Sequence, residues 1–340
     1  MPLCLWMDTF QYWITFFYHS QLKTTTLLLH RLPETFMAPN LRHLTLPDIS
    51  PQRLFRFLTT TISLATLKLS NIQISYFHPR LLVAHLRSLP QLEELSIVFS
   101  TPIPHPGTEE ELFGEEETPA MLPNLKTFWF KGTSTYLESL VSQMNAPLLE
   151  KLRITLFSQI VLSSPQLSHL ISTTKAFQPL KVTIVFDSNE VSVNTVHTRR
   201  GDFILCVRDM SLNWRVDWVA QICSALAPTL SDVEHLTLGI FSPTIPTQWQ
   251  SSRIDSTTWH TLLRSFIGVK ELYIEYGLVW PLSWALQADE VGLDAGFLPN
   301  LQSIIARTNQ FTSFIDTRQM VGRPVRFSSF PVPQSSTRRK

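Results

Sequence analysis

The 340-residue chain has little cysteine, glycine and charge. Its three cysteines lie far apart and form no C-x-x-C pair, which excludes a disulfide-stapled scaffold and a cysteine-rich zinc site. Only 10 glycines stand against 23 prolines, and neither G-x-G-x-x-G nor G-x-x-x-x-G-K-[ST] occurs, so glycine-rich phosphate loops are excluded. Charged residues make up 16% of the chain and the formal net charge is +1, which argues against a general nucleic-acid-binding protein.

Long apolar runs and catalytic motifs are also missing. The most apolar early stretch, residues 1–18, is broken by Asp8, falls short of the ~20 apolar residues of a membrane span, and lacks the features of a signal peptide. No H-E-x-x-H, His-x-His or G-x-S-x-G occurs, and Cys206 and Cys223 lie in apolar surroundings typical of inert buried thiols. The sequence predicts a protein that is not an enzyme, needs no cofactor or metal, and does not span a membrane. The absence of any N-x-[ST] acceptor favours an intracellular location, cytoplasmic or nuclear.

The dominant positive signal is a repeat. An apolar anchor, two polar residues and an apolar-x-apolar triplet recur along the chain, as in the L-x-x-L-x-L core of leucine-rich repeats. The copies are APNLRHLTL (38–46), TISLATLKL (61–69), LPQLEELSI (89–97), LPNLKTFWF (122–130), APLLEKLRI (146–154), a degenerate QPLKVTIVF (178–186), LSDVEHLTL (230–238), FIGVKELYI (266–274) and LPNLQSII (298–305). The gap of 53 residues between anchors Leu180 and Val233 is about two units long, and FILCV at 203–207 is expected to supply the missing strand.

The segments between the copies carry apolar residues three and four positions apart, the pattern of an amphipathic helix. They include residues 51–60, 78–89, 137–144, 218–226 and 259–266. Alternating strands and helices predict an α/β fold with parallel strands and helices packed outside them. One unit cannot bury its own apolar face, so the units must stack. The sequence therefore predicts a right-handed leucine-rich-repeat solenoid, or horseshoe, of nine or ten irregular strand–helix units with a parallel sheet on the concave side.

Three regions follow from the repeat boundaries. Residues 1–37 are expected to form an N-terminal cap or remnant segment, and residues 38–316 the repeat domain. Within that domain, residues 101–120 carry Pro102, Pro104 and Pro106 and then six glutamates, with no lysine or arginine, which predicts an acidic surface loop. Residues 317–340 carry six basic residues and no acid, which predicts a basic, partly disordered tail.

Most of the chain, from about residue 30 to 327, resembles the leucine-rich-repeat part of fungal F-box proteins, especially the large basidiomycete paralogue families. The residues that carry the resemblance are LPETFMAPNLRHLTL, LRSLPQLEELSIVFSTPIP, APLLEKLRITLF, WHTLLRSFIGVKELYI, LQADEVGLDAGFLPNLQS and FIDTRQMVGRPV. The resemblance implies a substrate receptor of an SCF-type ubiquitin ligase, docked through an F-box on the Skp–cullin scaffold.

The F-box itself is not evident in this sequence. Leu32, Pro33 and Glu34 echo the opening of an F-box, but the strand expected at residues 41–46 leaves no room for its three helices. Either the gene model is truncated or this paralogue has lost the docking module. Binding to the Skp adaptor is therefore expected only if an F-box lies upstream. The alternatives are a stand-alone interaction scaffold, an enzyme built on the solenoid, and a truncated product without a selected function.

The expected function is protein binding on the concave strand face, by a monomer that binds neither nucleic acid nor membrane. Strand residues alternate, so the polar residues of each copy face away from the core. The candidate partner-binding residues are His43, Lys68, Glu94, Trp129, Lys151, Arg153, His235, Glu271, Tyr273 and Glu275. An exposed aromatic anchor at Trp129 is one interpretation, and packing beneath a loop is the other. Lys151 and Arg153 form either a charge-complementary surface or a plain solvated strand face.

Overall fold

The computed structural model describes residues 24–26, 39–47, 51–72, 78–102, 119–157, 165–196, 201–208, 212–240, 256–288, 298–307 and 310–329. Thirteen of the strands in these residues form one sheet in the spatial order β1-β2-β3-β4-β6-β8-β11-β10-β9-β12-β13-β14-β15, and β5 pairs with β7. The predicted α/β architecture with a long, mostly parallel sheet and accompanying helices is confirmed. The loop expected at 101–120 falls, for residues 103–118, outside the described residues.

The strands and helices alternate along most of the chain. The strands are β1 (Thr24–Thr26), β2 (His43–Pro47), β3 (Thr66–Ile72), β4 (Glu94–Phe99), β5 (Ala120–Met121), β6 (Thr127–Gly132), β7 (Met144–Asn145), β8 (Lys151–Leu156), β9 (Lys181–Phe186), β10 (Glu190–Val196), β11 (Asp202–Arg208), β12 (His235–Ile240), β13 (Glu271–Ile274), β14 (Ser303–Ala306) and β15 (Arg326–Ser329). The helices are α2 (Pro51–Leu58), α3 (Pro79–Leu86), α4 (Ser134–Val141), α5 (Pro165–Thr173), α6 (Leu212–Ala225), α7 (Ala227–Leu230), α9 (Ser256–Arg264), α10 (Tyr276–Ala288) and α11 (Thr312–Met320).

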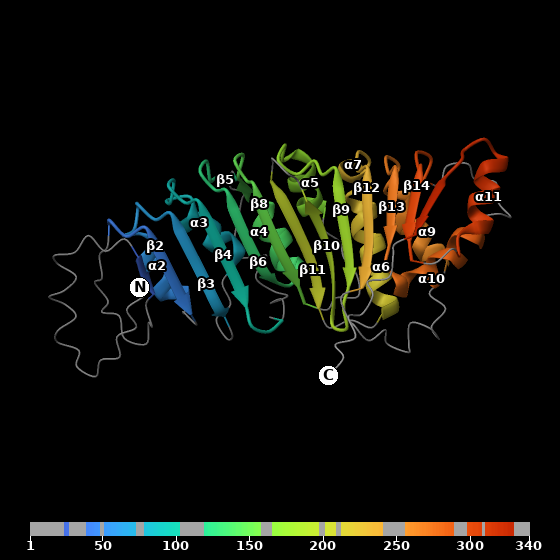
Figure 1. Cartoon of the computed structure of the whole chain (residues 1–340). Coiled ribbons are helices and arrows are strands. Elements are labelled where there is room, and N and C mark those ends of the chain that lie inside the picture. Colours follow the sequence, from blue (N-terminus) through green and yellow to red (C-terminus); the bar gives the residue numbers. More distant parts are fainter. Residues whose placement is uncertain are drawn as a thin grey trace, which may run out of the picture.

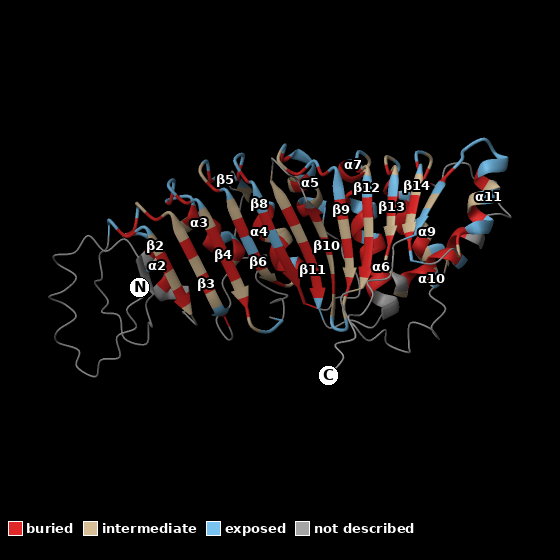
Figure 2. Cartoon of the chain, in the orientation of Figure 1, coloured by how far each residue is buried: buried red, intermediate tan, exposed pale blue. Residues whose placement is uncertain are grey.

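The core lies between the sheet and the helices, which stand behind the row of strands in Figure 1. The repeat produces it directly, because the parallel strands share one register. Leu95 of β4 stands opposite Leu67 of β3 and Phe128 of β6, so apolar side chains form rows across the sheet, all of them buried. Each such side chain contributes roughly 1.5–3 kcal/mol by leaving water. Figure 2 shows the resulting alternation of buried and more exposed bands along the strands.

The copy at residues 178–186 departs from the pattern. Eight of the nine predicted anchors are buried, but Leu180 is 52% exposed, and the preceding Phe177 and Pro179 are buried instead. β9, which follows Leu180, does not pair with β8. It opens an antiparallel meander of β9, β10 and β11, in which β11 pairs in parallel with β8 and β9 pairs in parallel with β12.

The expectation of a wholly parallel sheet is therefore wrong at β10, which runs antiparallel to both of its neighbours. The physical reason is the connection. Asp187, Ser188 and Asn189 join β9 to β10, and the backbone N–H of Asp187 donates to the carbonyl of Glu190 at 2.8 Å. A turn this short closes a hairpin, whereas a parallel pair needs a crossover of a dozen or more residues. FILCV at 203–207 does form a strand, as expected, but it fills the position beside β8.

Strands also lie outside the boundaries expected for the repeat domain. β1, within the region expected as a cap, pairs in parallel with β2, and the rest of residues 1–38 lies outside the described residues. At the other end, the boundary at residue 316 falls inside α11, and β15 adds a strand beside β14. Arg318, expected in the basic tail, is buried, and one guanidinium N–H donates to the carbonyl of Leu298 at 2.7 Å. Residues 330–340 lie outside the described part.

No helix in the described residues is both long and apolar enough to cross a membrane.

Candidate protein-binding face

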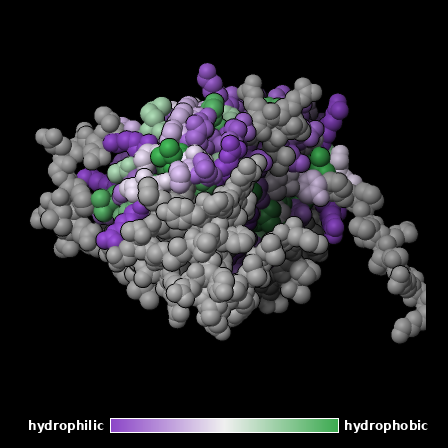
Figure 3. All heavy atoms as spheres, turned by 90° about the vertical axis from the view of Figure 1, so that its left-hand side faces the viewer, coloured by the Kyte–Doolittle hydropathy of each residue, from purple (hydrophilic) through white to green (hydrophobic). Residues whose placement is uncertain are grey.

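One face of the sheet is free of the described helices, and we call it the open face. It is turned toward the viewer in Figure 1. The alternation of each strand places its polar residues there, because the opposite side chains are held in the core. Seen from the N-terminal end of the sheet, the described surface is mainly hydrophilic, with scattered hydrophobic residues (Figure 3).

The ten residues predicted from the sequence all lie on this face or at its margin, in two groups. The first group lies on β2, β3, β4, β6 and β8 and consists of His43, Lys68, Glu94, Trp129, Lys151 and Arg153. The second lies on and just after β12 and β13 and consists of His235, Glu271, Tyr273 and Glu275. The meander of β11, β10 and β9 separates the two groups, so the face does not bring them together.

Several of these side chains are already engaged with one another. The ammonium of Lys68 lies 2.8 Å from the carboxylate of Glu94, and the Nδ1 of His235 lies 2.9 Å from that of Glu271. The Nδ1 of His43 lies 3.0 Å from the hydroxyl of Thr66. The Lys68–Glu94 pair neutralises charge on the face, and exposed pairs of this kind contribute little stability, typically below about 1 kcal/mol each.

Glu275 has a structural contact. Its carboxylate accepts a hydrogen bond of 2.6 Å from the backbone N–H of Ile240, at the end of β12, and it lies close to Gly239. A β-carbon at residue 239 would stand 3.2 Å from the carboxyl carbon of Glu275. The glycine thus leaves room for the carboxylate to reach the end of the neighbouring strand.

Trp129 and Arg153 form the centre of the first group. They are register partners on β6 and β8, and the guanidinium carbon of Arg153 lies 5.2 Å from the centre of the indole ring. Trp129 is 39% exposed although it lies in a central strand. An arginine over a tryptophan face is a cation–π pair, which leaves the outer side of the guanidinium and the ring edge for a further contact.

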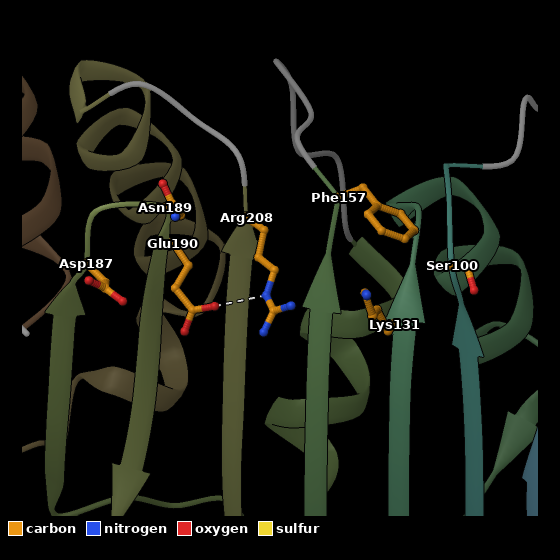
Figure 4. A pocket seen from close by; sticks show the side chains of 7 residues that line it. All are labelled: Ser100, Lys131, Phe157, Asp187, Asn189, Glu190 and Arg208. Atoms are coloured by element: carbon orange, nitrogen blue, oxygen red, sulfur yellow. Dashed lines mark hydrogen bonds and ion pairs between the residues drawn. The ribbon is translucent and has the colours of Figure 1, made fainter. Parts of the chain in front are cut away.

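The carboxyl ends of β4, β6, β8 and β11 border a polar hollow of about 470 Å³, which the turn between β9 and β10 completes (Figure 4). Its lining residues are Ser100, Lys131, Phe157, Asp187, Asn189, Glu190 and Arg208. Arg208 donates to Glu190 at 2.9 Å, and the ammonium of Lys131 lies 5.4 Å from the centre of the Phe157 ring. The hollow thus presents cations from β6 and β11 facing carboxylates from the hairpin.

A buried arginine holds the hairpin side of the hollow. Arg215 of α6 is 6% exposed, and its guanidinium donates to the carbonyls of Asp187 and Ser188. Burial lowers the pKa of Arg215, while the charge of Asp187 acts in the opposite direction. Arg215 therefore fixes the turn that carries Asp187 and Asn189 to helix α6.

Sequence reasoning did not single out the hollow. Lys131 and Arg208 were not candidates, because the strand order that brings β11 beside β8 is not visible in the repeat. One local signal was present: the Asp-Ser-Asn run between two alternating apolar segments is typical of a hairpin turn. Trp280 and Trp284 of α10, 59% and 63% exposed and stacked with ring centres 6.4 Å apart, were likewise not singled out.

The described thiols do not form a reactive site. Burial raises the pKa of Cys206 to about 11, with a smaller effect of the same sign from Glu190, and burial also raises the pKa of Cys223. Within the described residues, no group of three or more histidine, cysteine, aspartate or glutamate side chains is arranged to hold a metal ion.

No family model matches the chain, and no curated protein matches it. Among solved structures, the crystal structure of the leucine-rich repeat-containing protein LegL7 from Legionella pneumophila is 14% identical, with 91% of this chain and 99% of that chain covered. The TM-score is 0.28, so the two chains superpose too poorly for any property to be transferred.

Proposed function

We propose that the chain is a protein-binding module that receives its partner on the open face, around Trp129 and Arg153. The observation that carries this proposal is a partly exposed tryptophan with an arginine over its ring, on the face of the sheet that is free of the described helices. Tryptophan and arginine are the residues most enriched among those that dominate binding energy at protein interfaces.

The overall shape belongs to the same proposal. A right-handed, horseshoe-like solenoid with the open face on its concave side would give the partner a long, curved surface. The proposal takes the chain as a monomer of 39.0 kDa in the cytoplasm or nucleus. Light scattering after size-exclusion chromatography measures the mass, and a mass near 78 kDa, twice that of the chain, would contradict the monomer.

The experiment compares capture of partners by three forms of the full chain: unchanged, Trp129→Ala and Trp280→Ala. Trp280 is the matched control, because it is also an exposed tryptophan but lies on α10. Partners are captured from an extract of the source cells and measured by quantitative mass spectrometry. Loss of an anchor residue worth about 2 kcal/mol corresponds to roughly a thirtyfold weaker complex. The same proteins captured equally well by Trp129→Ala would contradict the proposal.

Substrate recognition in an SCF-type ubiquitin ligase is the specific form of this function that the F-box resemblance supports, and a stand-alone scaffold is its alternative. Mapping the 5′ end of the transcript, followed by co-expression of its whole open reading frame with a Skp adaptor, separates the two. A stable complex supports the receptor role. No complex at micromolar concentrations supports the scaffold.

A further inference from the structure

The charges on the open face are unevenly neutralised. Among the described residues, Lys68 and Arg208 each form an ion pair with a glutamate on a neighbouring strand. Lys131, Lys151 and Arg153 form none, and all three lie on the adjacent strands β6 and β8. We call these three residues the cation stripe.

The geometry of the stripe is set by the register of β6 and β8. Lys151 stands opposite Thr127, Arg153 opposite Trp129, and Lys131 opposite Thr155. Each step along a strand is about 3.3 Å, so the three positions follow one another at intervals of about 6.6 Å. Alternate side chains of an extended peptide repeat at the same interval. Carboxylates at every second position of such a peptide would meet the three cations in turn.

We infer, on the basis of the protein-binding role proposed above, that the partner presents an extended acidic segment that lies along β6 and β8 with its carboxylates on the cation stripe. Trp129, which is 39% exposed, gives this segment an apolar contact beside the middle cation. On either side, Lys68 of β3 and Arg208 of β11 are already paired with Glu94 and Glu190, so the unpaired cations between them in the described residues are those of β6 and β8.

A single-stranded nucleic acid also needs cations and aromatic stacking, but the surroundings of the stripe disfavour it. A backbone of phosphates needs a positively charged groove over several nucleotides. Here Asp202 stands beside Lys151 in the register of β11 and β8, and Asp187 and Glu190 line the far side of the hollow. A short peptide with charges at fixed intervals fits this arrangement better than a continuous chain of phosphates.

The test uses fluorescence anisotropy with a labelled nine-residue peptide that carries glutamate at alternate positions. Its matched peptide has glutamine in place of glutamate, and a nine-nucleotide oligothymidylate serves as the nucleic-acid probe. We expect the glutamate peptide to bind the full chain at least tenfold more tightly than the glutamine peptide at 50 mM salt, with the difference shrinking at 300 mM. Equal binding of the two peptides, or tighter binding of the oligonucleotide, overturns the inference.

Variants locate the site. Lys151→Gln and Arg153→Gln should each weaken the glutamate peptide at least threefold, and the triple variant with Lys131→Gln at least tenfold. Lys181→Gln is the matched control, because Lys181 is an exposed lysine on β9 of the same face that forms no ion pair among the described residues. It should change the affinity less than twofold. An equal loss in Lys181→Gln overturns the inference, and thermal unfolding of each variant checks that it is folded.

The two proposals fail separately. If capture of natural partners depends on Trp129 but the glutamate peptide binds no better than the glutamine peptide, the acidic segment is excluded and the protein-binding face stands. If the glutamate peptide binds through the cation stripe but Trp129→Ala leaves the capture of natural partners unchanged, the proposed function fails instead.

Discussion

Arg153 holds its guanidinium carbon 5.2 Å from the centre of the Trp129 ring, across the β6–β8 pair. A double-mutant cycle measures what this contact contributes to folding. We expect the coupling energy between Arg153→Ala and Trp129→Ala to be about 0.5–1 kcal/mol, the value of an exposed cation–π pair. Urea denaturation of the four proteins gives the numbers. Additive effects would show that the two side chains are stacked without stabilising each other.

Arg215 should matter for stability more than any exposed arginine of the meander. Arg215→Met removes the donors to the carbonyls of Asp187 and Ser188, and a hydrogen bond from a charged donor is worth about 1.5–3 kcal/mol. Arg208→Met is the control, because it breaks an exposed ion pair worth less than about 1 kcal/mol. The urea concentration at the midpoint of unfolding measures the loss of stability in each variant. A smaller loss for Arg215→Met than for Arg208→Met would contradict the role of Arg215 in holding the turn.

The side chain of Thr195, near the end of β10, forms hydrogen bonds to the backbone of β11. Its buried hydroxyl accepts from the backbone N–H of Phe203 at 2.8 Å and donates to the carbonyl of the same residue at 3.2 Å. Thr195→Val keeps the shape and leaves both backbone groups unpaired, at an expected cost of about 1–3 kcal/mol. Thr183→Val, on the half-exposed side of β9, should change stability by less than about 0.5 kcal/mol. If Thr195→Val and Thr183→Val lowered the free energy of unfolding equally, the hydrogen bonds of Thr195 to Phe203 would not contribute to stability.

The buried thiols should resist thiol reagents until the chain unfolds. With a pKa of about 11, Cys206 is about a thousandth thiolate at pH 8, against about a quarter for an ordinary thiol. In a Cys4→Ser background, we expect no reaction with Ellman's reagent at pH 8 in the folded chain and two reactive thiols in guanidinium chloride. Rapid reaction of the folded chain would contradict the burial of Cys206 and Cys223.

The same thiols give stability a pH dependence of defined sign. Their pKa values are raised in the folded state, so above the unfolded value the unfolded chain binds fewer protons than the folded chain. Their contribution to stability is therefore present below about pH 8.5 and is lost as the pH rises toward 11. Comparison of the unchanged chain with Cys206→Ala by urea denaturation at pH 8 and pH 10 isolates the effect of Cys206. A loss of stability between these pH values that is no smaller in Cys206→Ala would contradict it.

The repeat units could be predicted from the sequence because the anchor and the apolar-x-apolar triplet specify both strand and core. Leu92, Leu95 and Ile97 are buried as their spacing requires, and the same holds for each regular copy. The direction of a strand is a different matter. Alternation over Val182, Ile184 and Phe186 is the same in a parallel and an antiparallel strand, so the pattern at 178–186 gave no sign that the meander begins there.

The candidate face could be predicted residue by residue but not as a site. Alternation alone places Lys151 and Arg153 on the outer face of their strand. It does not tell which charges are neutralised by a neighbour, because the ion pair of Lys68 depends on a residue 26 positions away. The hollow depended on strand order as well, since Arg208 reaches the end of β8 only through the reversed path of the meander.

The reversed path between β8 and β12 bears on how this chain can change length in evolution. A stack joined in chain order gains or loses whole units, since each touches only its neighbours. Whole units cannot be gained or lost within the meander, because β11 pairs with β8 while β9 pairs with β12. A duplication or deletion with one end inside residues 157–234 would leave strands without partners. Gain and loss of units are therefore confined to the two arms, β1–β8 and β12–β15, which can diverge independently around a segment of constant length.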